Sequence, residues 1–306
     1  GVEEFSYWQL FLFYCGYVGF LNLGINDGMY LRLGGKEYDK IDHALIGSQF
    51  KIVFLFQIII AMLITLIAIY SIKSEARIFV LISTSIYMVL QNMSGCLGYV
   101  FQAVNYTKIY SLSVIIDKIL FIIFVSVLLI FKIDWYEIFV IFYLISKALT
   151  LLYCIWKGQK IIFSKFCSLI IVFKELWENM SVGLKLMLSN IASMLILGST
   201  RFFIDNMWGI TMFGKFSLAL SLTNFFLLFI SQVSMVLFPA LKRSKKQQQY
   251  QVYSFSRNAL GLLLPTIFLT YMPMKYLLGL WLPQYKESFR YLALLLPLCT
   301  FDGKMN

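Results

Sequence analysis

Long apolar runs, separated by short polar connections, fill most of the chain. A helix of about 20 residues crosses a hydrocarbon core of about 30 Å. The apolar runs therefore predict an all-α, polytopic membrane protein with about nine transmembrane helices. The predicted spans are 7–25, 51–72, 78–104, 110–131, 135–156, 181–205, 213–240, 257–281 and 288–306.

The spans predicted at 181–205 and 213–240 are separated only by a short connection, 206–212. Two membrane-spanning helices joined so closely must run in opposite directions. This part of the sequence therefore predicts an antiparallel helical hairpin.

Both helices of the predicted hairpin carry a polar face. Asn190 and Arg201 share one face of the first helix, and Asp205 follows Arg201 by one turn. Ser217 and Asn224 recur on one face of the second helix. Hydrocarbon offers no partner for an amide or a charge, so these faces must meet other helices or a hydrated cavity. The pattern indicates the interior of a transporter.

The span predicted at 78–104 has a similar face, on which Gln91 and Gln102 lie with Gly95 and Gly98. The small residues favour close contact with another helix. Each glutamine needs a polar partner, either on a neighbouring helix or in a hydrated cavity. The sequence leaves both alternatives open.

Charged residues also occur inside predicted spans: Asp117, Lys118, Lys147 and Lys185. Each costs at least about 2.5–3.5 kcal/mol within a membrane, so such charges usually mark a pathway or an ion pair. Asp117 and Lys147 lie on consecutive antiparallel spans, both roughly 13–15 Å deep. Their equal depth predicts that these two side chains form an ion pair.

Composition supports the membrane assignment and limits other functions. Hydrophobic residues make up 60% of the chain and charged residues 13%, and the mean hydropathy is +0.80. A soluble domain contains about 25% charged residues. The net charge of +11 lies mainly in the loops, so we expect no nucleic-acid partner. The five cysteines are scattered and, with His43, form no zinc set; we expect no metal and no cofactor.

The distribution of Lys and Arg predicts the orientation of the chain. The loop after the first predicted span and the connection at 157–180 belong to the set of loops that is richer in these residues. Positively charged loops lie on the cytoplasmic side. We therefore place these two connections in the cytoplasm and the alternate loops outside.

Three stretches carry a resemblance to a known family. FGKFSLALSLTNFF, followed by VLFPALKR, resembles the oligosaccharide flippases of the polysaccharide-export superfamily. Tyr14 to Asp39 is similar to the end of the second helix and the next loop in that family, and Gly279 to Leu298 to its ninth-to-tenth helix connection. The resemblance implies a two-lobed helical bundle, here a fragment that lacks the first and last helices.

The resemblance also implies a division of the chain. It gives an incomplete N-terminal lobe at 1–156, a basic amphipathic connection at 157–180 and an incomplete C-terminal lobe at 181–306. The connection either lies along the membrane surface or is an ordinary cytoplasmic linker.

The predicted function is export of an isoprenoid-diphosphate-linked oligosaccharide, an O-antigen or capsular repeat unit, across the cell membrane. The cavity candidates for substrate binding are Lys118, Lys147, Lys185, Arg201, Gln91, Asn190 and Asn224. Asp117 and Asp205 are candidates for ion coupling, which the resemblance implies. The four cationic candidates outnumber the two acids, as an anionic headgroup requires. We expect membrane lipids, a polysaccharide polymerase and export machinery as partners.

Other functions are compatible with parts of the pattern. A multidrug antiporter of the same superfamily favours acidic cavity residues, whereas cations dominate here. A membrane-embedded glycosyltransferase or polymerase needs an acidic cluster or a large outer loop. The nearest acidic cluster, Glu37, Asp39 and Asp42, falls in a loop that is predicted to be cytoplasmic. A structural membrane scaffold is a further alternative. The chain has no phosphate-binding loop of the GxxxxGK[ST] type, and we expect a transporter rather than an enzyme.

Overall fold

The structure is a computed structural model that describes residues 1–243, 269, 271–276 and 278–305. All regular structure in these residues is helical, as predicted. The elements are α1 (Val2–Tyr17), η1 (Val18–Asn22), α2 (Ile25–Leu33), η2 (Tyr38–Lys40), α3 (His43–Ser71), α4 (Glu75–Ala103), α5 (Thr107–Ile130), α6 (Tyr136–Lys157), α7 (Gln159–Ile162), α8 (Leu169–Arg243), η3 (Pro283–Tyr285) and α10 (Lys286–Met305).

Within the described residues, four helices are long and apolar enough to cross a membrane: α3, α4, α5 and α6. They match the four spans predicted between 51 and 156. The number rises to six if α1 with α2, and the two parts of α8, each form one bent span. The predicted count of nine is therefore not confirmed, and the span predicted at 257–281 lies largely outside the described residues.

The contacts divide the chain into two compact units. The first contains residues 3–200 and the second residues 201–306, with Gly1 in the first and Val2 in the second. The division falls inside α8, about 20 residues after the start of the predicted C-terminal lobe. The lobe limits at 156 and 181 stay predictions.

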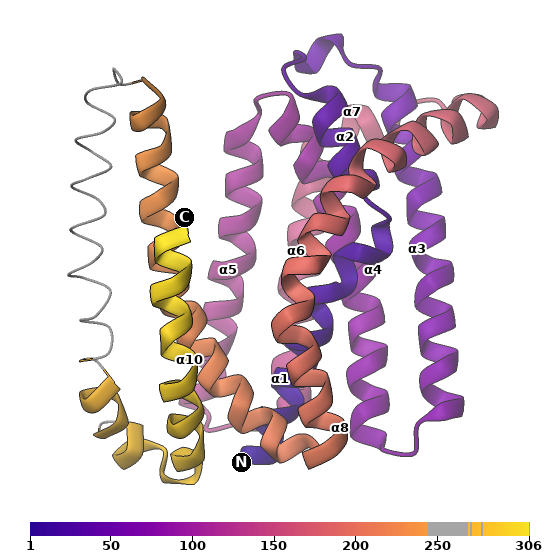
Figure 1. Cartoon of the computed structure of the whole chain (residues 1–306). Helices are drawn as coiled ribbons and strands as arrows, with labels where there is room; N and C mark the ends of the chain where they lie inside the picture. Colours follow the sequence, from indigo (N-terminus) through magenta and orange to yellow (C-terminus); the bar gives the residue numbers. More distant parts are fainter. Residues whose placement is uncertain (244–268, 270, 277, 306) are drawn as a thin grey trace. The chain divides into compact units, whose positions relative to one another are not determined.

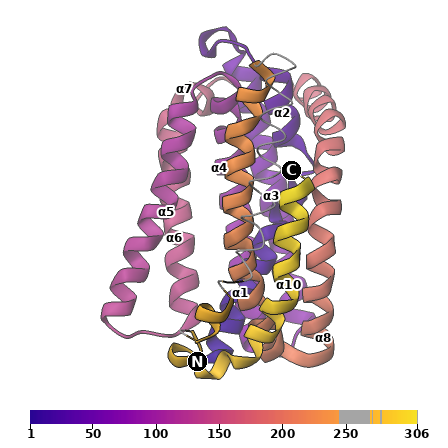
Figure 2. The same cartoon turned by 60° about the vertical axis from the view of Figure 1, so that its left-hand side comes forward.

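In the first unit, α3 packs along α4, and α6 packs against both α4 and α5 (Figure 1). Figure 2 shows α5 and α6 side by side, joined at one end by a short connection. Where α2, α3, α4, α6 and the start of α8 meet, they bury a common apolar core. Met93, Leu97 and Phe101 of α4 lie at its centre, each at most 1% exposed.

The outer faces of this unit are apolar. Met62 and Ile67 of α3 and Ile130 of α5 are each at least 60% exposed. Such a surface would be unfavourable in water, but it is suited to hydrocarbon. With 22 residues, α6 is about 33 Å long. The exposed Trp135 and Trp156 lie at its two ends, where aromatic side chains anchor a span at the membrane surfaces.

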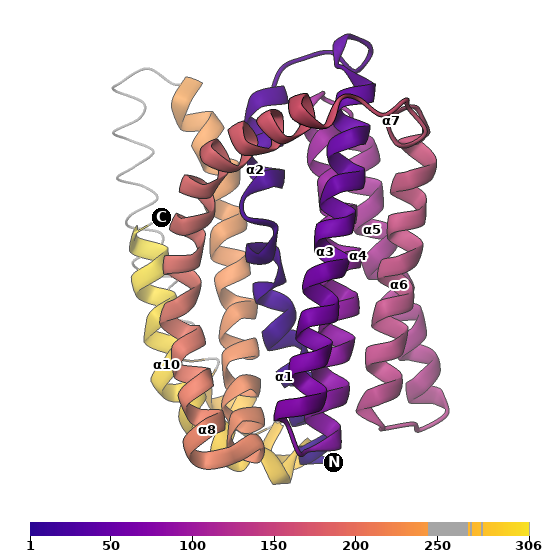
Figure 3. The ribbon, with the colours of Figure 1, turned by 90° about the vertical axis from the view of Figure 1, so that its right-hand side faces the viewer.

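The stretch predicted as an inter-lobe connection, 157–180, contains α7 and the first turns of α8. These turns cross the end of the first unit above α2 (Figure 3). Val172 and Leu176 enter the apolar core, and Arg32 of α2 binds side chains of the same turns. This stretch is therefore a packed part of the first unit, and its place at the membrane surface or in the cytoplasm stays a prediction.

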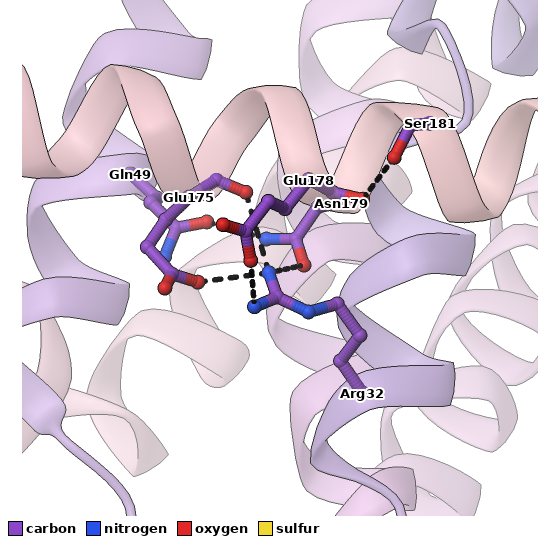
Figure 4. A network of polar contacts seen from close by, with 6 residues as sticks. All are labelled: Arg32, Gln49, Glu175, Glu178, Asn179 and Ser181. Atoms are coloured by element: carbon purple, nitrogen blue, oxygen red, sulfur yellow. Dashed lines mark hydrogen bonds and ion pairs between the residues drawn. The ribbon is translucent and has the colours of Figure 1, made fainter.

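Arg32 is the centre of a polar network that joins α2, α3 and α8 (Figure 4). Its guanidinium donates to the carboxylates of Glu175, at 2.8 Å, and Glu178, at 2.6 Å, and to Oδ1 of Asn179, at 2.8 Å. The amide nitrogen of Asn179 in turn donates to Gln49 of α3 at 2.7 Å. A planar guanidinium with several donors suits this fork-like arrangement.

Glycines allow α2 and α8 to approach one another closely. A Cβ atom on Gly28 would lie 2.5 Å from the carbonyl carbon of Asn179, and one on Gly183 would lie 2.6 Å from the backbone nitrogen of Gly28. Backbone atoms cannot yield as a flexible side chain can. Only glycine therefore fits at position 28 of α2 and at position 183 of α8, where the two helices cross.

In the second unit, the chain reverses at Gly209, whose φ of 82° and ψ of 176° interrupt α8. Nε of Arg201 donates to Oγ of Ser217 at 3.1 Å, although 16 residues separate them. In one straight helix those residues would be about 24 Å apart. The predicted hairpin is confirmed, and its polar faces meet at this hydrogen bond.

Residues 271–276 and 278–281 are also helical and belong to the same unit. Leu292 and Leu296 of α10 pack with Ala219 of α8, and Lys215 donates to Glu287 at 2.6 Å. This hydrogen bond lowers the pKa of the exposed Glu287 carboxyl below its usual value. α10 is therefore attached to α8 by an apolar contact and an ion pair.

Candidate functional site

The site begins at a break in the first membrane segment. The axes of α1–η1 and α2 differ by 59°, and Leu23 and Gly24 between them have φ values of 53° and 72°. The prediction of one span at 7–25 followed by a loop at 26–50 was therefore wrong. The chain turns at these two residues and continues as α2. An apolar run has the same composition whether or not it is bent, so hydropathy did not reveal the break.

Buried amides satisfy backbone carbonyls at this break. Nδ2 of Asn92, on α4, donates to the carbonyl of Val18 at 3.0 Å, and Nε2 of Gln57, on α3, donates to that of Leu21 at 3.1 Å. Asn92 also donates to Oε1 of Gln57 at 2.9 Å. A broken helix inside a membrane needs such partners because hydrocarbon supplies none. The hydropathy pattern did not single out Gln57 and Asn92, although each is an amide within an apolar run.

A cavity of about 630 Å³ opens beside the break, and all of its lining residues belong to the first unit. Its charged lining residues are Asp27, Asp117, Lys118 and Lys147. Its amides are Asn22, Asn26, Gln91, Asn92 and Asn190, and its aromatic rings are those of Phe20, Tyr87, Tyr99 and Tyr110. The lining is thus polar and aromatic within an apolar helical bundle.

An ion-pair cluster lies at this cavity. Oδ2 of Asp117 is 3.5 Å from Nζ of Lys147 and 3.4 Å from Nζ of Lys118. The side chains of Asp117 and Lys147 are 7% and 11% exposed, whereas that of Lys118 is 59% exposed. The ion pair predicted from equal depth on consecutive helices is confirmed. Two cations share one carboxylate, so the cluster carries one excess positive charge.

Aromatic residues surround the ion-pair cluster. The ring of Tyr143 stacks on that of Tyr87, with centroids 5.5 Å apart, and Nζ of Lys118 lies 5.8 Å from the Tyr143 centroid. The hydroxyl of Tyr87 donates to Oε1 of Gln91 at 3.3 Å. Of the two alternatives left open for Gln91, the cavity is the one that applies, because this side chain lines the cavity and its partner Tyr87 lies on the same helix.

The structure brings five of the predicted site residues together at the cavity: Gln91, Asp117, Lys118, Lys147 and Asn190. Lys185 belongs to the same unit, but it is exposed and does not line the cavity. Arg201, Asp205 and Asn224 belong to the second unit. Asp205 is buried and Asn224 is exposed. The roles of these four residues stay predictions.

The acidic loop cluster at 37–42 has structural contacts. Glu37 forms an ion pair with Lys40 at 3.0 Å, and Asp39 forms one with Lys160 at 3.8 Å. Asp42 accepts a hydrogen bond from the backbone nitrogen of Leu45 at 2.9 Å and so caps α3. These carboxylates stabilise the loop and the start of α3.

The fold and the cavity together define a multi-helix membrane protein with a charged, polar interior. A family model described as polysaccharide biosynthesis protein matches residues 20–245, and the chain belongs to this family. The matched range includes every residue that lines the cavity except Gly19. Comparisons with curated proteins and with solved structures found no significant match. The chain is thus a polysaccharide-related membrane protein.

Proposed function

We propose that this protein is a flippase that carries an isoprenoid-diphosphate-linked oligosaccharide across the cell membrane by alternating access. The observation that supports this proposal most is the excess positive charge of the Asp117 cluster at a polar cavity. The family of the chain supports it as well, because a membrane protein of polysaccharide biosynthesis is suited to moving lipid-linked units across the membrane.

The ion-pair cluster suits an anionic headgroup. Lys147 is largely buried, so its ammonium cannot reach bulk water without movement of the helices. It pairs with Asp117, and a diphosphate entering the cavity would offer it a second anionic partner. Lys118 is more exposed and is free to follow the ligand. Replacing Asp117 by the diphosphate as the partner of Lys147 costs less free energy than leaving the buried ammonium without an anionic partner.

The rest of the cavity suits a glycan. Its amides offer both donors and acceptors to sugar hydroxyl groups. The exposed faces of its aromatic rings offer apolar contact to the C–H faces of sugars. A volume of about 630 Å³ lies in the range of ordinary ligand sites. We therefore place the diphosphate at the lysines and the first sugars along the amide-lined wall.

The charge of the whole cavity differs from the sequence-based expectation. Four cations to two acids were expected, whereas this cavity is lined by two lysines and two aspartates. Asp27 is the additional acid. An overall balance of charge leaves a multidrug antiporter as the second candidate, because organic cations would bind near Asp27. The excess positive charge around Asp117 favours the flippase.

Reciprocal variants of the ion pair test the proposal. The measurement is flipping of a fluorescent isoprenoid-diphosphate oligosaccharide in proteoliposomes, with protein abundance measured in parallel. We expect Lys147→Ala to abolish flipping, and the double exchange of Asp117→Lys with Lys147→Asp to restore abundance but not flipping. Lys160→Ala is the matched control, because Lys160 is 72% exposed and outside the cavity. It should flip as the wild type does.

The same variants separate the alternatives. A double exchange that restores flipping as well as abundance would make the pair purely structural. Full flipping by Lys147→Ala would overturn the assignment of the lysine to the headgroup. Transport of an organic cation, lost in Asp27→Asn but kept in Lys147→Ala, would favour the multidrug antiporter.

A further inference from the structure

Three oxygen-bearing side chains at the break between η1 and α2 have no cationic partner among the residues that the structure describes. Oδ1 of Asn22 and Oδ1 of Asn26 are buried and accept no hydrogen bond from any described residue. The two side chains are 2% and 6% exposed, and both line the cavity. Asp27 follows directly and lines it too, and none of the ion pairs of the described residues holds its carboxylate.

The orientation of the Asn26 amide is fixed by its neighbours. Its Nδ2 donates to the backbone carbonyl of Asn92 at 3.1 Å, so Oδ1 must point elsewhere. The nearby amide groups of Asn92 and Gln57 already donate to backbone carbonyls at the break. The local donors are therefore committed, and the free oxygens of Asn22 and Asn26 are a consequence of the network that holds the bend.

The local electrostatics favour a cation at this position. A buried acceptor without a donor is destabilising, and here two occur within five residues. The carbonyl end of η1 contributes a negative partial charge. The nearby cations are engaged elsewhere, because Lys118 and Lys147 bind Asp117 and Arg32 binds Glu175 and Glu178.

We propose that Asn22, Asn26 and Asp27 form a binding site for a monovalent alkali cation, with sodium as the probe ion. Broken membrane helices offer amide and carbonyl oxygens of the kind that coordinate sodium. A single carboxylate among neutral oxygens matches one positive charge. Calcium prefers six to eight oxygens with several carboxylates, which this break does not supply.

This inference goes beyond the proposed function and does not depend on it. A bound cation would offset the charge of Asp27 and leave the lysine cluster as the dominant charge of the cavity. Cation and anionic substrate would then each increase the affinity for the other by the same factor. Binding of sodium alone can be measured without any substrate, so a failure here leaves the flippase proposal intact.

The experiment measures binding of radioactive sodium to the purified full-length protein in lipid nanodiscs, with choline chloride at constant ionic strength. Asn22→Leu removes the free oxygen and keeps the approximate volume. Loss of one direct ligand should weaken sodium binding at least about tenfold, since even an outer partner of a metal site contributes that much. Asn22→Asp keeps a ligand oxygen and should bind at least as tightly as the wild type.

Asn206→Leu is the matched control, because Asn206 is an exposed asparagine of the second unit. Its sodium affinity should equal that of the wild type. In choline chloride, Asn22→Leu should also melt no lower than the wild type, because it removes an unsatisfied buried group. Absence of sodium binding by the wild type, competition by choline as strong as that by unlabelled sodium, or wild-type affinity in Asn22→Leu would each overturn the proposal.

Discussion

Arg32→Ala should weaken the attachment of the first turns of α8 to α2. The change removes all three side-chain hydrogen bonds of the guanidinium, at 2.8, 2.8 and 2.6 Å. It also leaves Glu175 and Glu178 close together on one face of α8 without their shared cation. Alanine is a good helix former, so the substitution does not by itself disturb α2.

The magnitude follows from the exposure of the partners. A hydrogen bond to a charged group contributes about 1.5–3 kcal/mol when it is well protected. Arg32 and Glu175 are 31% and 28% exposed, but Glu178 is 41% exposed, so solvent screens part of the network. We expect a loss of about 2–4 kcal/mol in the free energy of unfolding. Arg32→Lys should recover less than half of it, because an ammonium cannot reproduce the fork.

The assay is reversible denaturation in mixed micelles, with limited proteolysis at the connection before α8 as a local measurement. Lys40→Ala is the control, because Lys40 pairs with Glu37 at 3.0 Å while both side chains are more than 70% exposed. Its loss should be at most about 0.5 kcal/mol. The reasoning would be refuted if Arg32→Ala lost no more than Lys40→Ala, or if proteolysis before α8 were unchanged.

Three further changes test other contacts. Gly28→Ala places a Cβ against a backbone carbonyl of α8 and should sharply reduce the yield of folded protein in size-exclusion chromatography, whereas Gly19→Ala, with no atom within 4 Å, should not. Asn92→Leu removes two donated hydrogen bonds and should lower the free energy of unfolding by about 2–4 kcal/mol. Lys215→Ala removes the partner of Glu287. In the wild type, the stabilisation from this pair should be complete above the usual pKa of glutamate and should disappear as the pH falls through the lowered pKa of Glu287. Thermal melts at several pH values should show this change in the wild type and not in the variant.

The sequence was sufficient for features that depend on one helix or on two consecutive helices. Apolar length placed α3 to α6, since a membrane sets the number of residues that a span requires. The short connection after residue 205 predicted the hairpin that the bond between Arg201 and Ser217 confirms. Depth within consecutive helices also predicted the pair of Asp117 and Lys147. Each of these predictions uses only the rise per residue and the alternation of direction.

The tertiary structure alone decided how helices distant in the chain meet. The bend at Leu23 and Gly24 is stable because Gln57 and Asn92, from two other helices, supply donors to its carbonyls. Likewise the first turns of α8 lie against α2 because Arg32 and two glycine contacts hold them there. Periodicity identifies which residues share a face, but it contains no information about which other helix that face will meet. The cavity, which residues of six elements line, therefore became visible only once those helices were placed.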